Sequence, residues 1–122
     1  IQISPALDYL LEHYAEQIKI QTLADVCRMS ETHFRRQFED AVNMTPVEYI
    51  NLVRIQKACE LISNTNDNMD SIALKSGFLS QSSFNRTFLK LVGIQPLKWK
   101  QQIKNNNVNS VNYKISAHEG WR

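Results

Sequence analysis

Glycine and proline are scarce in this chain of 122 residues, which contains three of each. An all-β sandwich uses both residue types at its many tight turns, so this composition disfavours that class and favours a helical protein. No apolar run reaches the roughly 18 residues that a membrane span requires. Ile1 begins directly in foldable sequence, without a basic leader, so we expect no signal peptide and a cytoplasmic protein.

Sequence features of catalysis and of metal binding are also missing. Neither of the two cysteines, Cys27 and Cys59, lies beside another cysteine, and the simpler interpretation is that both are small core residues, with redox sensing as the alternative. No pair of histidines has the spacing of zinc ligands, so we expect no metal and no other cofactor. Without a nucleophile motif, a glycine-rich phosphate loop or a carboxylate pair, an enzyme is not predicted.

Charge is divided unevenly between the two halves of the chain. Residues 1–61 contain six Lys/Arg and nine Asp/Glu, a net charge of −3, whereas residues 62–122 contain eight and three, a net charge of +5. The total of +2 is too small to indicate a polyanionic partner by itself. The basic second half is the more favourable part of the chain for binding a polyanionic partner.

The chain resembles itself at an offset of 50 residues. Phe34, Arg36, Phe38, Pro46 and Tyr49 are matched by Phe84, Arg86, Phe88, Pro96 and Trp99. Upstream, Leu23-Ala24 matches Ile72-Ala73 at an offset of 49, so the second copy has one extra residue, which we place in a turn. Such self-similarity indicates a duplicated structural unit.

Each copy is predicted to be a short helix, a tight turn, a longer helix and a helix that starts at a proline. In the first copy Thr22 and Asp25 have the spacing of a capping box, which predicts a helix from about 22 to Arg28. Ser30 and Ser80 are then placed to cap the longer helices. The buried faces of these helices are predicted to contain Phe34, Phe38, Ala41 and Val42, and in the second copy Phe84, Phe88, Leu91 and Val92.

The remaining helix boundaries follow from local signals. Asn43 and Gly93 tolerate the left-handed conformation that ends helices. Thr45-Pro46-x-Glu48 combines a cap, a first-turn proline and a capping-box glutamate, so it predicts a helix over about 46–63, roughly 27 Å long, that acts as a rigid spacer. Further helices are predicted at about 69–76 and after Ser4-Pro5, where the serine is the expected cap.

Polar side chains suited to reading DNA lie opposite the phenylalanines of both longer helices. Arginine can bond two acceptors of guanine in the major groove, and Asn or Gln can pair with adenine. The capped helix starts at Ser30 and Ser80 would direct backbone N–H groups toward phosphates. The residues on these faces are Thr32, Arg35, Arg36 and Glu39 in the first copy, and Gln81, Ser82, Asn85, Arg86 and, one turn further, Lys90 in the second.

A solvated helix surface would explain one such face, but two matched faces favour a pair of helix-turn-helix units. The chain resembles the DNA-binding domain of the AraC/XylS family of bacterial transcription regulators over about residues 5–104. The resemblance is carried in the first copy by Leu23-Ala24, Met29-Ser30-x-x-His33-Phe34-x-Arg36-x-Phe38 and Thr45-Pro46-x-x-Tyr49. In the second copy it is carried by Ile72-Ala73-x-x-x-Gly77-Phe78-x-Ser80-x-Ser82-x-Phe84-x-Arg86-x-Phe88 and Gly93-x-x-Pro96-x-x-Trp99.

The resemblance implies an all-α, seven-helix domain whose third and sixth helices enter successive major grooves of double-stranded DNA. Its organisation would be a domain over 1–104, with a first unit at about 5–44, a linker helix at 46–63 and a second unit at about 69–104, followed by an Asn-rich tail over 105–122. Base contacts would fall on Thr32, Arg35, Arg36, Gln81, Ser82, Asn85 and Arg86, and backbone contacts on Ser30, Ser80, Ser83 and Lys90.

One departure from the family pattern concerns the first turn, where Arg28 replaces the usual glycine. A left-handed Arg28 would cost on the order of 1 kcal/mol, and the alternative is a turn of different shape. Glu39 and Asp40 would repel phosphates if they faced them, so we expect the second unit to bind the DNA backbone more strongly.

Alternatives from other classes remain open at this point. A helical protein-interaction module would use the same faces to bind a protein and would show no steep salt dependence with DNA. A catalytic part outside this sequence would make the domain the DNA-targeting arm of an enzyme. The resemblance also implies RNA polymerase as a possible partner, and a ligand-sensing or dimerising N-terminal domain outside this sequence.

Overall fold

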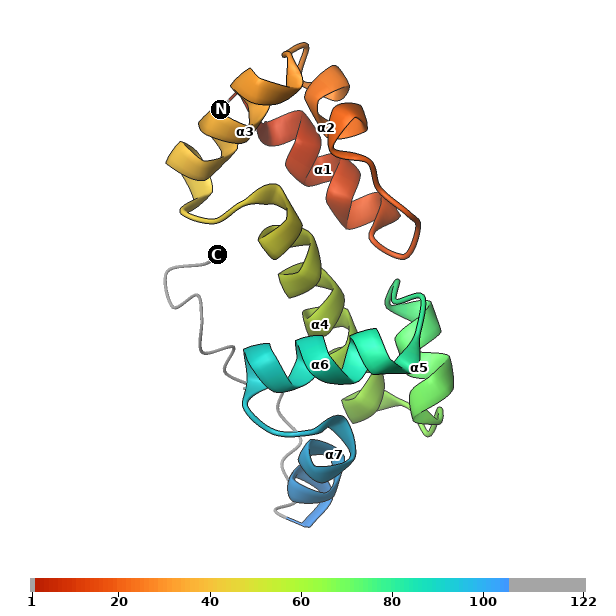
Figure 1. Cartoon of the computed structure of the whole chain (residues 1–122). Coiled ribbons are helices and arrows are strands. Elements are labelled where there is room, and N and C mark those ends of the chain that lie inside the picture. Colours follow the sequence, from red (N-terminus) through yellow and green to blue (C-terminus); the bar gives the residue numbers. More distant parts are fainter. Residues whose placement is uncertain (1, 106–122) are drawn as a thin grey trace. The chain divides into compact units, whose positions relative to one another are not determined.

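The computed structural model describes residues 2–105 (Figure 1). These residues form helices and turns without a strand, so the all-α prediction is confirmed. Of the tail predicted over 105–122, only Asn105 is among the described residues, and it is the last residue of a helix. Residues 106–122 lie outside the described residues. The seven helices are α1 (Ser4–His13), α2 (Ile20–Val26), α3 (Glu31–Val42), α4 (Pro46–Asn64), α5 (Met69–Lys75), α6 (Gln81–Val92) and α7 (Pro96–Asn105).

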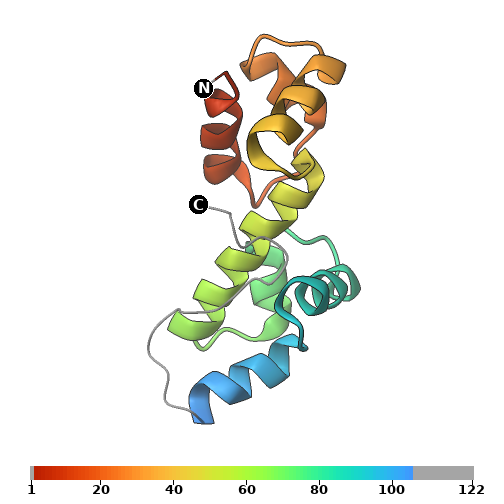
Figure 2. The same ribbon diagram turned by 90° about the vertical axis from the view of Figure 1, so that its left-hand side faces the viewer.

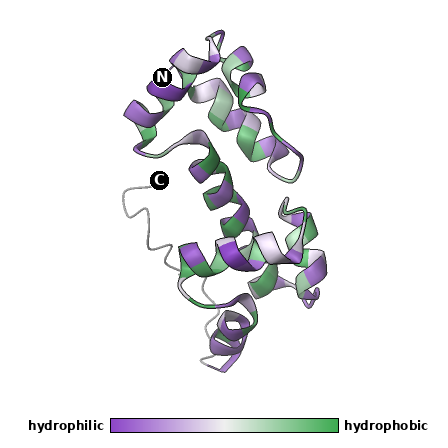
Figure 3. Ribbon diagram, viewed as in Figure 1, coloured by the Kyte–Doolittle hydropathy of each residue, from purple (hydrophilic) through white to green (hydrophobic). Residues whose placement is uncertain are grey.

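The chain forms two compact units, Ile1–Val53 (unit 1) and Arg54–Arg122 (unit 2). The division falls within α4, so the first part of that helix belongs to unit 1 and the remainder to unit 2. Polar and apolar residues alternate around the helices of both units (Figure 3). Each unit therefore buries the apolar side of its own helices.

In unit 1, α2 packs against both α1 and α3. The aromatic part of the core joins α3 to α4. Phe34 lies 5.5 Å from Phe38 between ring centroids, and Phe38 meets the edge of Tyr49 at 5.6 Å. Leu10 from α1 and Leu23 from α2 are fully buried alongside them. The phenylalanine positions predicted from the first copy thus lie in one small core.

In unit 2, α6 contacts both α5 and α7 (Figure 2). Phe84 lies 5.7 Å from Phe88, and Phe88 lies 6.0 Å from Trp99 in an edge-on arrangement. This repeats the aromatic chain of unit 1, with Trp99 in the place of Tyr49. Phe78 adds a further edge contact to Phe84 at 5.4 Å. The duplication visible in the sequence is therefore a duplication of core packing.

Serine side chains cap both long helices, as predicted. Ser30 Oγ accepts a hydrogen bond from the backbone N–H of His33 at 3.2 Å, and Ser80 Oγ accepts one from Ser83 at 3.1 Å. Each bond satisfies a backbone donor that lacks a partner within the helix.

The ends of the long helices and the start of α4 also follow the sequence signals. Asn43 and Gly93 adopt positive φ values of 64° and 99°, and each backbone N–H bonds back to a carbonyl of its helix. At the start of α4, the Thr45 N–H donates to Glu48 Oε1 at 2.8 Å, and the Glu48 N–H donates to Thr45 Oγ1 at 3.1 Å. The predicted capping box is confirmed.

The capping box predicted for α2 is wrong. Lys19 is the N-cap of this helix and makes no side-chain cap bond. The Thr22 N–H already donates to the Lys19 carbonyl at 3.0 Å, so Thr22 lies inside the first turn. Asp25 Oδ1 instead accepts from Gln21 Nε2 at 2.8 Å. Because the helix begins at Ile20, neither Thr22 nor Asp25 stands at a position that a capping box requires.

Two other local predictions are wrong. Ser4 is not a cap but the first residue of α1, whose N-cap, Ile3, makes no side-chain bond. Ala41 was expected on the buried face of α3 and is exposed, whereas its counterpart Leu91 is buried. The position lies at the margin of the apolar face, where a leucine side chain reaches the core and a single methyl group does not.

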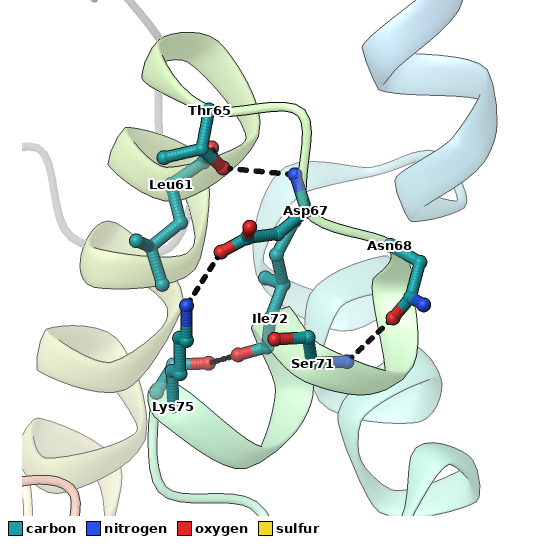
Figure 4. A network of polar contacts seen from close by, with 8 residues as sticks. Leu61, Thr65, Asp67, Asn68, Ser71, Ile72 and Lys75 are labelled. Carbon is teal, nitrogen blue, oxygen red and sulfur yellow. Dashed lines mark hydrogen bonds and ion pairs between the residues drawn. The ribbon is translucent and has the colours of Figure 1, made fainter.

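A polar network organises the break between α4 and α5 (Figure 4). Thr65 Oγ1 accepts from the Asp67 N–H at 3.2 Å, and the Asp67 carboxylate pairs with Lys75 Nζ at 2.7 Å. Asn68 Oδ1 accepts from the Ser71 N–H at 2.9 Å and caps α5. Residues 65–68 thus form an ordered turn that leads into the helix-turn-helix of unit 2.

Candidate nucleic-acid interface

The turns before α3 and α6 have the same hydrogen bonding. Arg28 has φ 58° and Gly77 has φ 108°, so both residues lie in the left-handed region. In unit 1 the carbonyl of Ala24 accepts from the residue five positions later at 3.0 Å, and in unit 2 the carbonyl of Ala73 does so at 2.9 Å. Of the two alternatives for the first turn, the structure has the left-handed one.

The exposed side of α3 presents most of the predicted reading residues together. Thr32 and Arg36 are exposed, and Arg35 is half-buried. These three residues line a shallow, open hollow of about 400 Å³ together with Glu39 and Asp40. The hollow therefore combines guanidinium donors with carboxylate acceptors on one helix face, opposite the buried phenylalanines.

Within this face, Arg35 is bound to Glu31. Arg35 Nη2 and Nε both donate to Glu31 Oε2, at 3.0 and 3.2 Å, and the two side chains are 44% and 40% exposed. A spacing of four residues from Glu to Arg favours this pair on a helix, and it is the signal that sequence reasoning left unused. Arg36 is the more accessible of the two arginines for an external acceptor.

On α6 the predicted residues also lie outside the buried face. Gln81, Ser82 and Arg86 are exposed, and Asn85 is half-buried. Ser83 is half-buried and donates its backbone N–H to the Ser80 cap, while Lys90 is exposed near the end of the helix. The structure thus brings every predicted site residue of the second copy onto α6 or its N-cap.

The two candidate reading helices differ in charge. α3 contains two arginines and three acidic residues, whereas α6 contains one arginine, one lysine and no acidic residue. The contrast extends to the units: residues 1–53 contain four basic and eight acidic residues, and residues 54–105 contain eight and three. Attraction to a polyanion must therefore come mainly from unit 2.

Cys59 fits the interpretation as a core residue, whereas Cys27 is only partly buried. Burial and the neighbouring Glu60 raise the pKa of the Cys59 thiol to about 12, so this side chain stays protonated at neutral pH. Burial also raises the pKa of Cys27, and a backbone hydrogen bond from Ala6 partly opposes the shift. Within residues 2–105 no three His, Cys, Asp or Glu side chains are grouped to hold a metal, and no helix is long and apolar enough to cross a membrane.

One residue on the α6 face was not singled out from the sequence. Leu89 is 41% exposed and lies about two helical turns beyond Ser82, on the same side as Arg86. Its matched position in unit 1 is Glu39, which lines the hollow on α3. The seven-residue spacing from Ser82 was the available signal, but a leucine is usually assigned to the core.

Comparison with known proteins agrees with this geometry. Residues 23–102 match a family model described as a helix-turn-helix domain. An AraC-type DNA-binding-domain structure from Chromobacterium violaceum has a TM-score of 0.77 at 22% identity, covering 83% of this chain and 90% of that one. The chain belongs to the AraC/XylS family. Its matched region is an AraC-type helix-turn-helix domain of transcription regulators.

Two further proteins are similar to this AraC-type domain. The chain is 32% identical over 96 residues to the uncharacterised HTH-type transcriptional regulator YisR of Bacillus subtilis, covering 79% of this chain and 33% of YisR. The DNA-binding domain of AdpA, solved with a target DNA, has a TM-score of 0.83 at 23% identity, covering 88% of this chain and 97% of that one. This AraC-type chain therefore spans about a third of the length of YisR.

Proposed function

We propose that this domain binds duplex DNA sequence-specifically and regulates transcription, with α3 and α6 each reading one of two successive major grooves. The observation that carries the proposal is the duplicated helix-turn-helix. In each unit a serine-capped helix buries two phenylalanines on one side and presents Arg36 or Arg86, at matched positions, on the other. A helix of this kind fits the major groove and can donate two hydrogen bonds to guanine.

On α6, Arg86 is proposed to donate to guanine O6 and N7, and Gln81 and Asn85 to pair with adenine edges. Ser82 can bond either kind of edge. Ser80, Ser83 and Lys90 are proposed to contact phosphates; the Ser80 hydroxyl accepts from the Ser83 N–H, so its own hydrogen stays available for a phosphate oxygen.

On α3, Thr32, Arg35 and Arg36 are proposed as the base-contacting residues, and Ser30 as a backbone contact. Arg36 is exposed and can donate directly to a base. Arg35 must first break or share its hydrogen bonds with Glu31 before it can reach a base. The negative charges of the three acidic side chains on this helix repel DNA phosphates. We therefore propose that unit 1 contributes discrimination and that unit 2 contributes most of the affinity.

The rest of the organisation is also a proposal. α4 would act as the linker that spaces the two reading units, within a domain over 1–104 followed by the tail. Because the chain spans about a third of YisR, a companion domain for ligand sensing or dimerisation is expected in the whole protein. RNA polymerase is the expected protein partner, the cytoplasm the expected compartment, and this domain is expected to have no catalytic activity of its own.

Selection of bound sequences from a random duplex pool, at near-physiological salt, tests the proposed function. We expect two different short motifs, about one helical turn of DNA apart, and an affinity for the selected duplex that falls steeply with salt. One enriched motif would mean that only one unit reads bases, which contradicts two-groove reading. No enrichment together with weak salt dependence would favour the protein-interaction alternative.

A further inference from the structure

Glu39 and Leu89 occupy matched positions, 50 residues apart, on the two candidate reading helices. At about 100° per residue, each projects between the directions of two proposed base-contacting residues of its own helix, which are Arg35 and Arg36 on α3 and Asn85 and Arg86 on α6. Ser82 projects in nearly the same direction as Leu89, seven residues earlier on α6. A groove that receives the proposed base-contacting residues therefore also receives positions 39 and 89.

Leu89 has no structural role in the core of unit 2. Its side chain is 41% exposed. In the described part of this unit, the partly buried hydrophobic residues packed against the core are Leu61, Val92, Ile94 and Ile103. A single exposed leucine is ordinary on a protein surface, but this one lies among polar side chains proposed to face bases. The position of Leu89 among these side chains, rather than its exposure, is therefore what suggests a role in DNA binding.

Glu39 belongs to the same surface as the proposed base-contacting residues of unit 1. It is exposed and lines the hollow on α3 together with Thr32 and Arg36. At the rim of a groove its carboxylate would meet phosphates and be repelled. Because it projects between Arg35 and Arg36, it points toward the base edges, where the amino group of cytosine offers a donor.

We infer that positions 39 and 89 each read one base: Glu39 accepts a hydrogen bond from the N4 amino group of cytosine, and Leu89 contacts the C5-methyl group of thymine. These are the major-groove groups that a carboxylate and an apolar side chain recognise. The inference rests on the proposed function and extends it. It gives the duplicated helices different specificities at this matched position, so the two halves of the bound site differ.

Removal of single thymine methyl groups tests the role of Leu89. In the duplex selected by the wild-type domain, each thymine is replaced in turn by deoxyuridine, which lacks only that methyl group. At one thymine we expect binding to weaken about fourfold, the value of one buried methyl group. The Leu89→Ala variant should be insensitive to the same replacement. Leu74→Ala, which removes a 70% exposed leucine from α5, is the matched control and should keep the effect.

Repeated sequence selection tests the role of Glu39. Because an amide pairs with adenine where a carboxylate pairs with cytosine, Glu39→Gln should exchange a preference for cytosine at one position for adenine, by on the order of tenfold. Glu12→Gln, an exposed change of the same kind on α1, should select the wild-type sequence.

The outcomes separate this inference from the function on which it rests. If the wild-type domain selects a sequence, yet no thymine shows the uracil effect and Glu39→Gln selects that same sequence, the inference is wrong and the proposed function stands. If no duplex is selected at all, both are wrong.

Discussion

Glu31 holds Arg35 on the exposed side of α3 through two hydrogen bonds to one carboxylate oxygen, at 3.0 and 3.2 Å. The pair is partly solvated, so it adds little to stability. Its consequence is for DNA binding, because a guanidinium that donates to a carboxylate of its own helix has fewer donors for an external acceptor. The first reading helix is therefore partly self-neutralised in the free domain.

Replacement of Glu31 by glutamine should strengthen DNA binding. The change removes a negative charge near the phosphates and releases Arg35, so we expect the affinity for the selected duplex to rise severalfold, with a loss of about 0.3–0.5 kcal/mol in the free energy of unfolding. Fluorescence anisotropy at two salt concentrations and urea unfolding measure the two effects. Glu12→Gln on α1 is the matched control. A weaker affinity would mean that Glu31 instead orients Arg35 toward the DNA.

Arg28→Gly should stabilise the domain. Arg28 has φ 58°, a conformation that costs an ordinary residue on the order of 1 kcal/mol and glycine almost nothing. The greater freedom of glycine in the unfolded chain offsets part of this gain, so we expect an increase of about 0.5 kcal/mol in the free energy of unfolding. Urea unfolding with an unchanged m-value checks it. Destabilisation would indicate that the Arg28 side chain makes a stabilising contact that outweighs its backbone strain.

Arg86→Ala should separate specific from nonspecific binding. If Arg86 donates to guanine, its loss should cost about 1–3 kcal/mol with the selected duplex and much less with a scrambled one. Lys57→Ala removes one positive charge of the same unit outside α6 and should lower both affinities equally. Equal losses for Arg86→Ala on the two duplexes would reassign this arginine to the DNA backbone.

Alkaline pH should destabilise unit 2 through Cys59. The folded pKa of about 12 lies above the ordinary thiol value of 9.0, so between these values the unfolded state releases the thiol proton and the folded state retains it. Stability from this group is complete below about pH 9 and declines as the pH rises toward 12, by at most about 1.4 kcal/mol per pH unit. Urea unfolding from pH 8 to 10.5 should show a shallower decline for Cys59→Ala than for the wild type. Identical slopes would contradict the burial of the thiol.

Sequence signals that act over a few residues predicted their structures well. Ser30, Ser80 and the Thr45–Glu48 pair cap the helices they were expected to cap, and Asn43 adopts the left-handed conformation. Each of these features depends on backbone groups within one turn of the side chain, so neighbouring residues suffice to decide it. Where a helix begins earlier than expected, as α2 does at Ile20, the spacing of Thr22 and Asp25 alone was misleading.

The sequence by itself determined the duplication, the helical class and the polar faces of α3 and α6, because the repeat and its periodicity are properties of residue order. Only the tertiary structure decided the conformation of Arg28 and the exposure of Ala41. Arg28 is left-handed because the chain turns sharply between α2 and α3, which pack against each other. Ala41 is exposed because core contact at the edge of a helix face depends on the reach of the side chain and on the neighbouring helix. Both are consequences of packing between segments, which residue order does not contain.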